Sequence, residues 1–239
     1  MGRFVLLFIA AITAAFLVGA CGPQRVEVGE LQTESRSIDP ENADSVRADL
    51  RIGLGELNLT GGADSLMEAE FAYNVAAWRP GVSYEVVGDT GELSVQQRGL
   101  AEGIPGPDVR NEWDVRLNDE VPMDLSVQMG GGVSDLDLDS LTLTALNLDV
   151  GAGATTVDLT GDWERDLNAV VRGGAGELTM LLPSQTGVRV NAETGLGRIN
   201  PDGLRKQGRA YVNDAYGDSE VSLEVDVSGG VGQINLQVV

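Results

Sequence analysis

The sequence contains no histidine and only one cysteine, Cys21, among its 239 residues. Intrachain disulfides are therefore impossible, and zinc sites built from cysteine and histidine are excluded by the same inventory. Serine–histidine and cysteine–histidine catalysis and histidine-ligated haem are excluded too, because each needs an imidazole. We therefore expect no cofactor and, with no nucleophile motif present, no enzyme.

Aromatic residues and lysine are also scarce. Only 5% of the residues are aromatic, and Lys206 is the single lysine. Glycine is abundant at 32 residues, and apolar residues make up 42% of the chain. This composition predicts an all-β protein with a thin aliphatic core, as in β-solenoids.

Basic residues are outnumbered by acidic ones, 16 against 37, which gives a net charge of −21. A field of this sign repels nucleic acids and anionic lipid surfaces, so we expect no nucleic-acid partner. An acidic, lysine-poor surface also suits a saline habitat, where salt screens the repulsion between like charges. That interpretation predicts unfolding on dilution into low salt.

One sequence motif recurs along the chain. It consists of a segment with an apolar residue at every second position, a glycine-x-glycine corner, and a second segment of the same alternation. The second corner glycine recurs at Gly132, Gly153, Gly176 and Gly197, in steps of 21, 23 and 21 residues. Further copies span residues 48–59 and 223–236. The near-constant step predicts a single-stacked β-solenoid with coils of about 21 residues. A β-sandwich with glycine-rich turns is the alternative.

The last step, from Gly197 to Gly232, is 35 residues long and implies an insertion within residues 201–218. Loops inserted into a repeat scaffold often carry function. We therefore consider this insertion a candidate partner-binding loop, with Lys206, Arg209, Tyr211 and Tyr216 as its residues. A longer corner that covers one end of the stack is the alternative interpretation.

The amino-terminal residues have the pattern of a secretory signal peptide. Arg3 precedes an apolar run that ends in small residues before Cys21, so residues 1–20 are expected to be a signal peptide. The sequence around Cys21 looks like a bacterial lipobox, which implies lipidation of Cys21 and anchoring in the cell membrane or outer membrane, facing away from the cytoplasm. An ordinary signal with a chance cysteine is the alternative. After the signal peptide we expect the lipidated Cys21 and a tether over residues 21–30, β-regions over 31–97 and 122–239, and a loop with a connecting strand over 98–121.

Acidic residues alternate with leucines in the second run of one coil. Asp135, Asp137 and Asp139 should therefore leave one strand on the same outward face, where they are a weak candidate for calcium binding. A charged solvent face that keeps the strands soluble is the alternative. The interpretation extends this face to Asp149 and Asp158.

Sugar chemistry is the second possibility raised by the side chains. Paired carboxylates could hydrolyse glycosides, although the many acidic residues single out no pair. The tryptophans could stack on sugars or, as is more usual, cap a core; they are Trp78, Trp113 and Trp163.

Several segments together resemble the toast-rack family of bacterial envelope proteins. They are residues 50–59 (LRIGLGELNL), 71–74 (FAYN), 80–86, 113–124 (WDVRLNDEVPMD), 146–161 (LNLDVGAGATTVDLTG) and 211–218 (YVNDAYGD). The family is similar to the soluble part of LiaF-type proteins, which in some bacteria modulate the response to cell-wall-active antibiotics. The resemblance implies a β-solenoid-like fold without established catalysis. The chain has a lipoprotein signal where LiaF-type proteins have several membrane helices, which argues against direct control of a sensor kinase.

We therefore expect a non-enzymatic, lipid-anchored envelope protein that acts as an adhesion, scaffold or sensing module. Its partner would be an envelope protein or a cell-wall polymer. The alternatives are a regulatory partner of an envelope-stress system and a carbohydrate-active enzyme.

Overall fold

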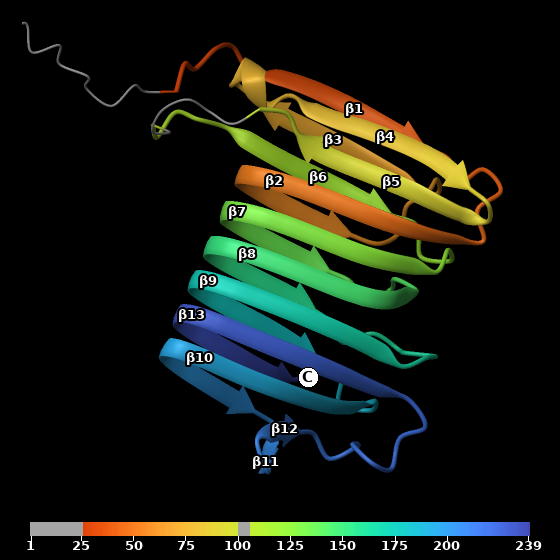
Figure 1. The fold of residues 1–239 in the computed structure, drawn as a ribbon, viewed down its shortest axis with the longest axis vertical. Coiled ribbons are helices and arrows are strands. Elements are labelled where there is room, and N and C mark those ends of the chain that lie inside the picture. Colours follow the sequence, from red (N-terminus) through yellow and green to blue (C-terminus); the bar gives the residue numbers. More distant parts are fainter. Residues whose placement is uncertain (1–25, 100–105) are drawn as a thin grey trace, which may run out of the picture.

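The computed structural model describes residues 26–99 and 106–239. Within them the chain forms thirteen strands and one short 3-10 helix, η1 (Ala76–Trp78) (Figure 1). The strands are β1 (Gln32–Ile38), β2 (Ser45–Thr60), β3 (Met67–Tyr73), β4 (Pro80–Val87), β5 (Thr90–Gln97), β6 (Asn111–Leu117), β7 (Met123–Asp137), β8 (Leu143–Asp158), β9 (Leu167–Leu182), β10 (Gly187–Asp202), β11 (Arg205–Gln207), β12 (Ala210–Val212) and β13 (Ser222–Val238).

Six of the strands are U-shaped coils, each with a first arm, a glycine bend and a second arm. Figure 1 shows their bends stacked on one side of the molecule. Neighbouring coils pair in parallel and in register through both arms, for example Leu125 with Leu146 before the bend and Leu136 with Val157 after it. The predicted β-solenoid-like fold is therefore confirmed, because every coil runs continuously from one layer into the other.

The core lies between the two layers of arms. One column of side chains consists of Leu50, Val127, Leu148, Val171 and Val227, which are paired in register and all buried. Burial of each such side chain contributes about 1.5–3 kcal/mol. The period-two pattern thus stabilises the fold only when coils stack, since a lone coil would leave this column exposed.

The bends depend on glycine because adjacent backbones nearly touch there. Gly153 has a φ of 134°, and a Cβ on it would lie 1.8 Å from the carbonyl oxygen of Gly132 in the coil above. The same contact recurs along the column, at 1.9 Å between Gly176 and Gly153 and 1.8 Å between Gly232 and Gly176. No side chain fits in this space, so the corner glycines set how closely the coils approach.

The stacking order differs from the chain order. The coils follow the sequence β2, β7, β8, β9, β13, β10, so the last strand lies between β9 and β10 and pairs in parallel with both. The long step before Gly232 is what allows this return. After β10 the chain forms β11 and β12, and β12 pairs with the first arm of β10. The insertion therefore covers one end of the stack, as the alternative interpretation proposed.

The opposite end is built from shorter strands. β5 pairs with the first arm of β2, and β6 pairs with its second arm. β4 then flanks β5 on one layer, and β3 and β1 extend the other. β6 lies within residues 98–121, the segment expected to hold a loop and a connecting strand; it is paired on both sides, and β2 pairs directly with β7, so the sheet is continuous there.

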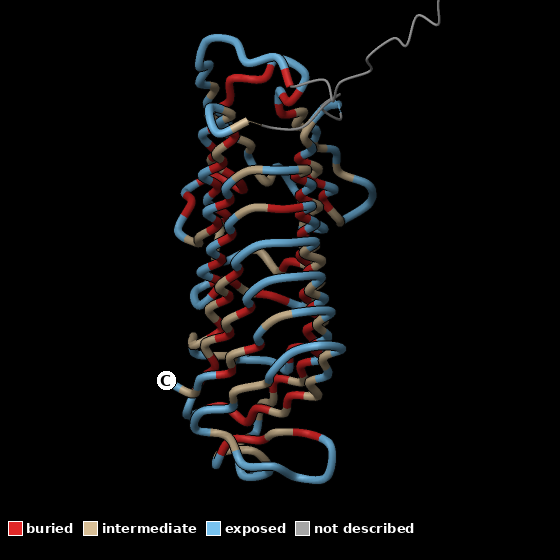
Figure 2. Tube along the Cα trace, turned by 90° about the vertical axis from the view of Figure 1, so that its left-hand side faces the viewer, coloured by how far each residue is buried: buried red, intermediate tan, exposed pale blue. Residues whose placement is uncertain are grey.

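The stack has two long edges. The bend edge consists of the six bends at residues 53–55, 130–132, 151–153, 174–176, 230–232 and 195–197; it faces the viewer in Figure 2. The loop edge is opposite, where the arms open. It consists of the loops at residues 39–44, 61–66, 88–89, 118–122, 138–142, 159–166, 183–186 and 213–221.

Candidate functional site

The predicted lipidation site, Cys21, lies outside the described residues. Val26 is the first residue that the structure describes, and it is buried against Val75 and Trp78. Among the described residues no helix has the length and apolar character needed to span a membrane.

The three candidate calcium ligands point outward as predicted. Asp135, Asp137 and Asp139 are exposed, and Leu136 and Leu138 between them are fully buried. In the part of the chain that the structure covers, no group of three or more Asp or Glu residues is placed to hold a metal ion.

The acidic face extends to only one of the two further aspartates. Asp158 pairs with Asp137 on the neighbouring second arm and accepts hydrogen bonds from the backbone and hydroxyl of Thr160 at 2.9 and 2.7 Å. Asp149 belongs to a first arm, on the other layer, and contacts Arg172 at 3.4 Å. The extension to Asp149 was therefore wrong, because the bend places it on the opposite outer face.

Asp139 is the one carboxyl group in this area with a raised pKa. Partial burial of the group is the largest cause, followed by the negative charge of Asp137 and a hydrogen bond to it, and then the charge of Asp158. A glycosidase needs two carboxyl groups about 5–10 Å apart with the sugar between them. The interaction between Asp137 and Asp139 places these two carboxyl groups closer together than that spacing.

The tryptophans support the core rather than a sugar platform. Trp78 and Trp113 are each 1% exposed. Trp113 packs edge-on against Phe71 with ring centroids 5.1 Å apart, and its indole N–H donates to Asn111 at 3.0 Å. Trp163 is half-buried and donates to the carbonyl of Leu159 at 2.9 Å. This geometry fits the alternative interpretation, in which the tryptophan side chains cap the core.

The four candidate residues of the insertion do not converge on one site. Lys206 and Tyr211 face each other across β11 and β12, with the ammonium 6.0 Å from the ring centroid. Tyr216 instead donates to Glu224 of β13 at 3.2 Å, and Arg209 is exposed in the turn between β11 and β12. Partner binding by this loop stays a prediction.

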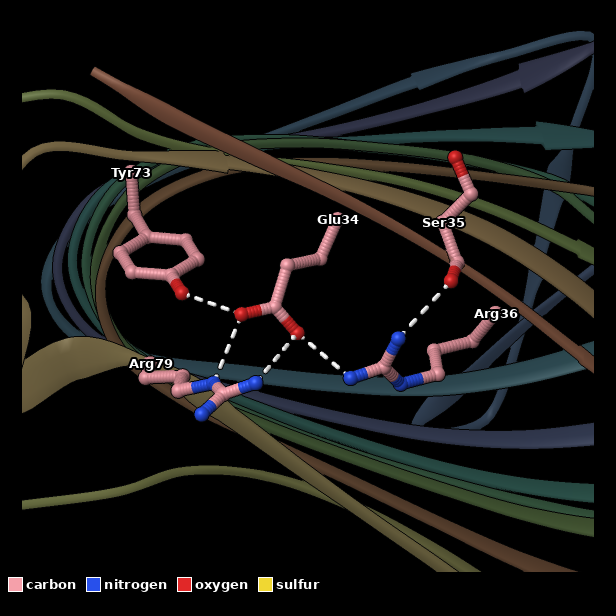
Figure 3. Close-up of polar contacts among 5 residues, drawn as sticks. All are labelled: Glu34, Ser35, Arg36, Tyr73 and Arg79. Carbon is pink, nitrogen blue, oxygen red and sulfur yellow. Dashed lines mark hydrogen bonds and ion pairs between the residues drawn. The ribbon is translucent and has the colours of Figure 1, made fainter.

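A polar cluster that the sequence did not indicate lies at the β1 end of the stack (Figure 3). Its centre is Glu34, whose side chain is only 17% exposed. Glu34 accepts from the Tyr73 hydroxyl at 2.6 Å, from Arg79 at 2.7 and 3.2 Å, and from Arg36 at 2.6 Å. Arg79 directly precedes β4, so the cluster joins the edge strands of the two layers.

The cluster holds Glu34 as a carboxylate. Hydrogen bonds from Arg79 and Tyr73 lower the pKa of Glu34, and the charges of both arginines add to this. Burial, and then the hydrogen bond to Glu34, raise the pKa of Tyr73. A carboxylate with a lowered pKa and with its oxygens already bonded is a poor general acid. Its inward charge on edge strand β1 instead discourages pairing with another sheet.

Two shallow hollows lie on the outer faces of the layers. One, of about 680 Å³, is lined by polar side chains of β1, β2, β3 and β6, including Arg36, Glu68 and Arg116. The other, of about 600 Å³, runs across the first arms next to the bend edge and includes Arg51, Gln128, Asp149 and Arg172. In this second hollow one polar side chain comes from each successive coil, so it could hydrogen-bond an extended polymer at regular intervals.

Comparison with known proteins gives one strong family match. Residues 27–181 match the N-terminal domain of toast-rack proteins (DUF2154). A crystal structure of a candidate cell adhesion protein from Clostridium sporogenes ATCC 15579 is 34% identical and superposes with a TM-score of 0.84. The superposition covers 88% of this chain and 100% of that chain. A search of curated proteins found no match.

Other solved structures are much less similar. A candidate adhesin from Parabacteroides merdae ATCC 43184 is 10% identical with a TM-score of 0.28, over 90% of this chain and 98% of that one. A candidate lipid-binding protein from Parabacteroides distasonis ATCC 8503 is 11% identical with a TM-score of 0.32, over 89% and 99%. Likenesses of this size carry no argument about function.

Proposed function

Because this chain belongs to the toast-rack family, we propose that it is a non-enzymatic protein of the bacterial cell envelope, anchored through lipid at Cys21. It acts as an adhesion, scaffold or sensing module that contacts an envelope protein or a cell-wall polymer. The observation that carries this proposal is the continuous stack, whose interior is filled by aliphatic side chains and whose accessible features are its outer faces and edges.

The geometry of the stack favours a binding role over catalysis. Parallel coils in register give outer faces whose side chains repeat once per coil, which suits recognition of an extended partner. The Glu34 carboxylate has a lowered pKa, and its oxygens are bonded by Arg36, Arg79 and Tyr73. The similar Clostridium sporogenes protein is a candidate cell adhesion protein, which agrees with this role.

The test uses crosslinking of the full chain in intact bacteria. Lys206 is the only lysine, so an amine-reactive crosslinker attaches to a side chain only in the insertion. A carboxylate-reactive crosslinker, in contrast, samples the whole acidic surface. Lys206→Arg is the matched control, because it keeps the positive charge and removes the reactive amine. Cys21→Ala releases the protein from the proposed anchor.

Each result separates the candidate roles. One dominant envelope protein, captured by wild type and lost with Lys206→Arg, supports scaffolding or regulation through the insertion. Capture of cell-wall polymer by the carboxylate-reactive reagent alone supports adhesion through the outer faces. Equal membrane association of wild type and Cys21→Ala contradicts the lipid anchor. Turnover of a cell-wall glycan that is lost with Asp139→Asn contradicts the non-enzymatic role.

A further inference from the structure

The net charge is distributed very unevenly between the two long edges of the stack. The eight loops of the loop edge contain fourteen acidic residues and one basic residue, Arg165. The loop edge thus carries −13 of the net charge of −21. An anionic surface repels this edge far more strongly than any other part of the described chain.

The bend edge is the opposite in character. Each of its six bends has a tip residue between two glycines, so that thirteen of its eighteen residues are glycine and none has a charged or polar side chain. The tip residues lie in register as Leu54, Gly131, Ala152, Ala175, Val231 and Leu196. Leu196 is 76% exposed, Val231 54% and Leu54 39%, and Val133 beside the row is 52% exposed. Figure 2 shows the bends following one another along this edge, mostly exposed, while the tip of the β7 bend, Gly131, is buried.

The backbone of the bend edge is also suited to an apolar environment. Ladder pairing skips only the first glycine of each bend and resumes at the tip, where Gly131 pairs with Ala152, Ala152 with Ala175 and Ala175 with Val231. Backbone groups that are hydrogen-bonded within the protein cost little when water is replaced by lipid, whereas unpaired groups cost several kcal/mol each.

The described chain begins beside the bend edge. Val26 packs with Trp78 and Val109. These two side chains share a hollow of about 470 Å³ with Leu54 and Val133 of the bends and their flanks. Val26 follows Cys21 by five positions in the chain. Five positions span at most about 18 Å even when fully extended, so a lipid on Cys21 would hold the bilayer within that distance of Val26, which packs beside the first bends.

We propose that the bend edge is a membrane-contact surface, which lies on the bilayer that holds the Cys21 lipid while the loop edge faces away. Leu54, Val231 and Leu196 reach the interface between headgroups and acyl chains, where exposed apolar side chains are favoured. The acidic loop edge is then as far from an anionic bilayer as the fold allows. This inference rests on the lipid anchor of the proposed function, and it adds a fixed orientation in which both outer faces stand upright and accessible.

The experiment places an environment-sensitive fluorophore at either edge of the lipidated protein. Ala175→Cys puts the label on the bend edge, and Ser184→Cys is the matched control on the loop edge; both residues are exposed. The full chain is isolated from bacterial membranes and reconstituted in phosphatidylglycerol–phosphatidylethanolamine vesicles with spin-labelled lipid as quencher. Flotation with the vesicles reports anchoring, and circular dichroism verifies that both variants fold.

We expect blue-shifted emission and several-fold stronger quenching at position 175 than at position 184. Adding Leu196→Glu and Val231→Glu should remove that difference without releasing the protein from the vesicles, because the lipid remains. Flotation with equal quenching at both positions overturns the inference and leaves the anchor intact. Shielding at position 175 that lipid does not quench, and that grows with protein density, assigns the edge to a second copy and also overturns it. Absence of flotation overturns the anchor itself and this inference with it.

Discussion

Two glycines three residues apart in β9 should respond to alanine in opposite directions. At Gly176 the φ is 137°, and an added Cβ would lie 1.9 Å from the carbonyl oxygen of Gly153. At Gly173 the backbone is unstrained, and the nearest atom to an added Cβ is the carbonyl oxygen of Ser228 at 3.8 Å. The same chemical change therefore tests the proposed role of the corner glycines directly.

The magnitudes follow from the two environments. Gly176→Ala combines a strained backbone, about 1–3 kcal/mol, with forced separation of two paired coils, about 1–3 kcal/mol more. We expect a loss of about 2–6 kcal/mol, a large share of the 5–15 kcal/mol that holds a typical domain together. Gly173→Ala removes backbone entropy from the unfolded chain and adds a methyl group beside a small cavity, so we expect a gain of about 0.5–1.5 kcal/mol.

A third variant separates backbone strain from steric contact. Gly208 has a φ of 64° and no atom within 4 Å of an added Cβ. Gly208→Ala should therefore cost only the left-handed conformation, about 1–2 kcal/mol. Urea unfolding of all three variants, followed by circular dichroism and by tryptophan fluorescence, gives the free energies. The reasoning is refuted if Gly176→Ala unfolds within about 0.5 kcal/mol of wild type, or if Gly173→Ala is as damaging as Gly176→Ala.

Three further predictions concern ionisation and stacking order. Glu34→Gln should cost about 1–3 kcal/mol at pH 7, because Arg79 loses its charged partner. The pKa of Glu34 is lowered from 4.5 in the folded protein, so the stability that wild type gains over Glu34→Gln should be complete above pH 4.5 and decrease as the pH falls through the folded pKa. Urea unfolding midpoints of both proteins between pH 7 and pH 3 test this. Asp139 has a pKa that is raised from 3.8 in the folded protein, so ionising it costs stability near neutral pH. Asp139→Asn should therefore stabilise the protein near neutral pH by up to about 0.5 kcal/mol and have no such effect below pH 3.8. Thermal unfolding measured across this pH range tests the prediction, and a destabilised variant near neutral pH would contradict it. Leu236 is fully buried three residues from the carboxyl terminus, so Leu236→Ala should cost about 2–5 kcal/mol, comparable to Leu148→Ala in chemical unfolding and unlike a frayed terminus.

Local pattern was sufficient to predict the coil itself. Alternation over residues 146–159 identified which side chains are buried, and the structure buries Leu146, Leu148, Val157 and Leu159 completely. The corner glycine Gly153 marked the bend, because positive φ and close backbone approach both select glycine. These features depend on a few neighbouring residues, and for that reason they are readable from the sequence.

The order of the coils was decided only in three dimensions. Each coil presents nearly the same column of aliphatic side chains and the same corner glycine, so β10 and β13 would both fit against β9. The pairing of β12 with β10 and the long return through residues 213–221 are what place β13 between them. The Glu34 cluster was equally hidden, because Tyr73 and Arg79 are 39 and 45 positions away in the chain and meet Glu34 only when β1, β3 and β4 close the end of the stack.

The sequence by itself therefore determined the shape of one repeat, the corner glycines and the outward direction of the Asp135–Asp137–Asp139 ladder, since these follow from backbone geometry at short range. The tertiary structure decided which coils are neighbours, which outer face receives Asp149 and how the charge divides between the two edges. Those properties arise because every coil turns back on itself at its bend. The two arms of one coil then lie on opposite layers, and loops that are distant in sequence lie together on one edge.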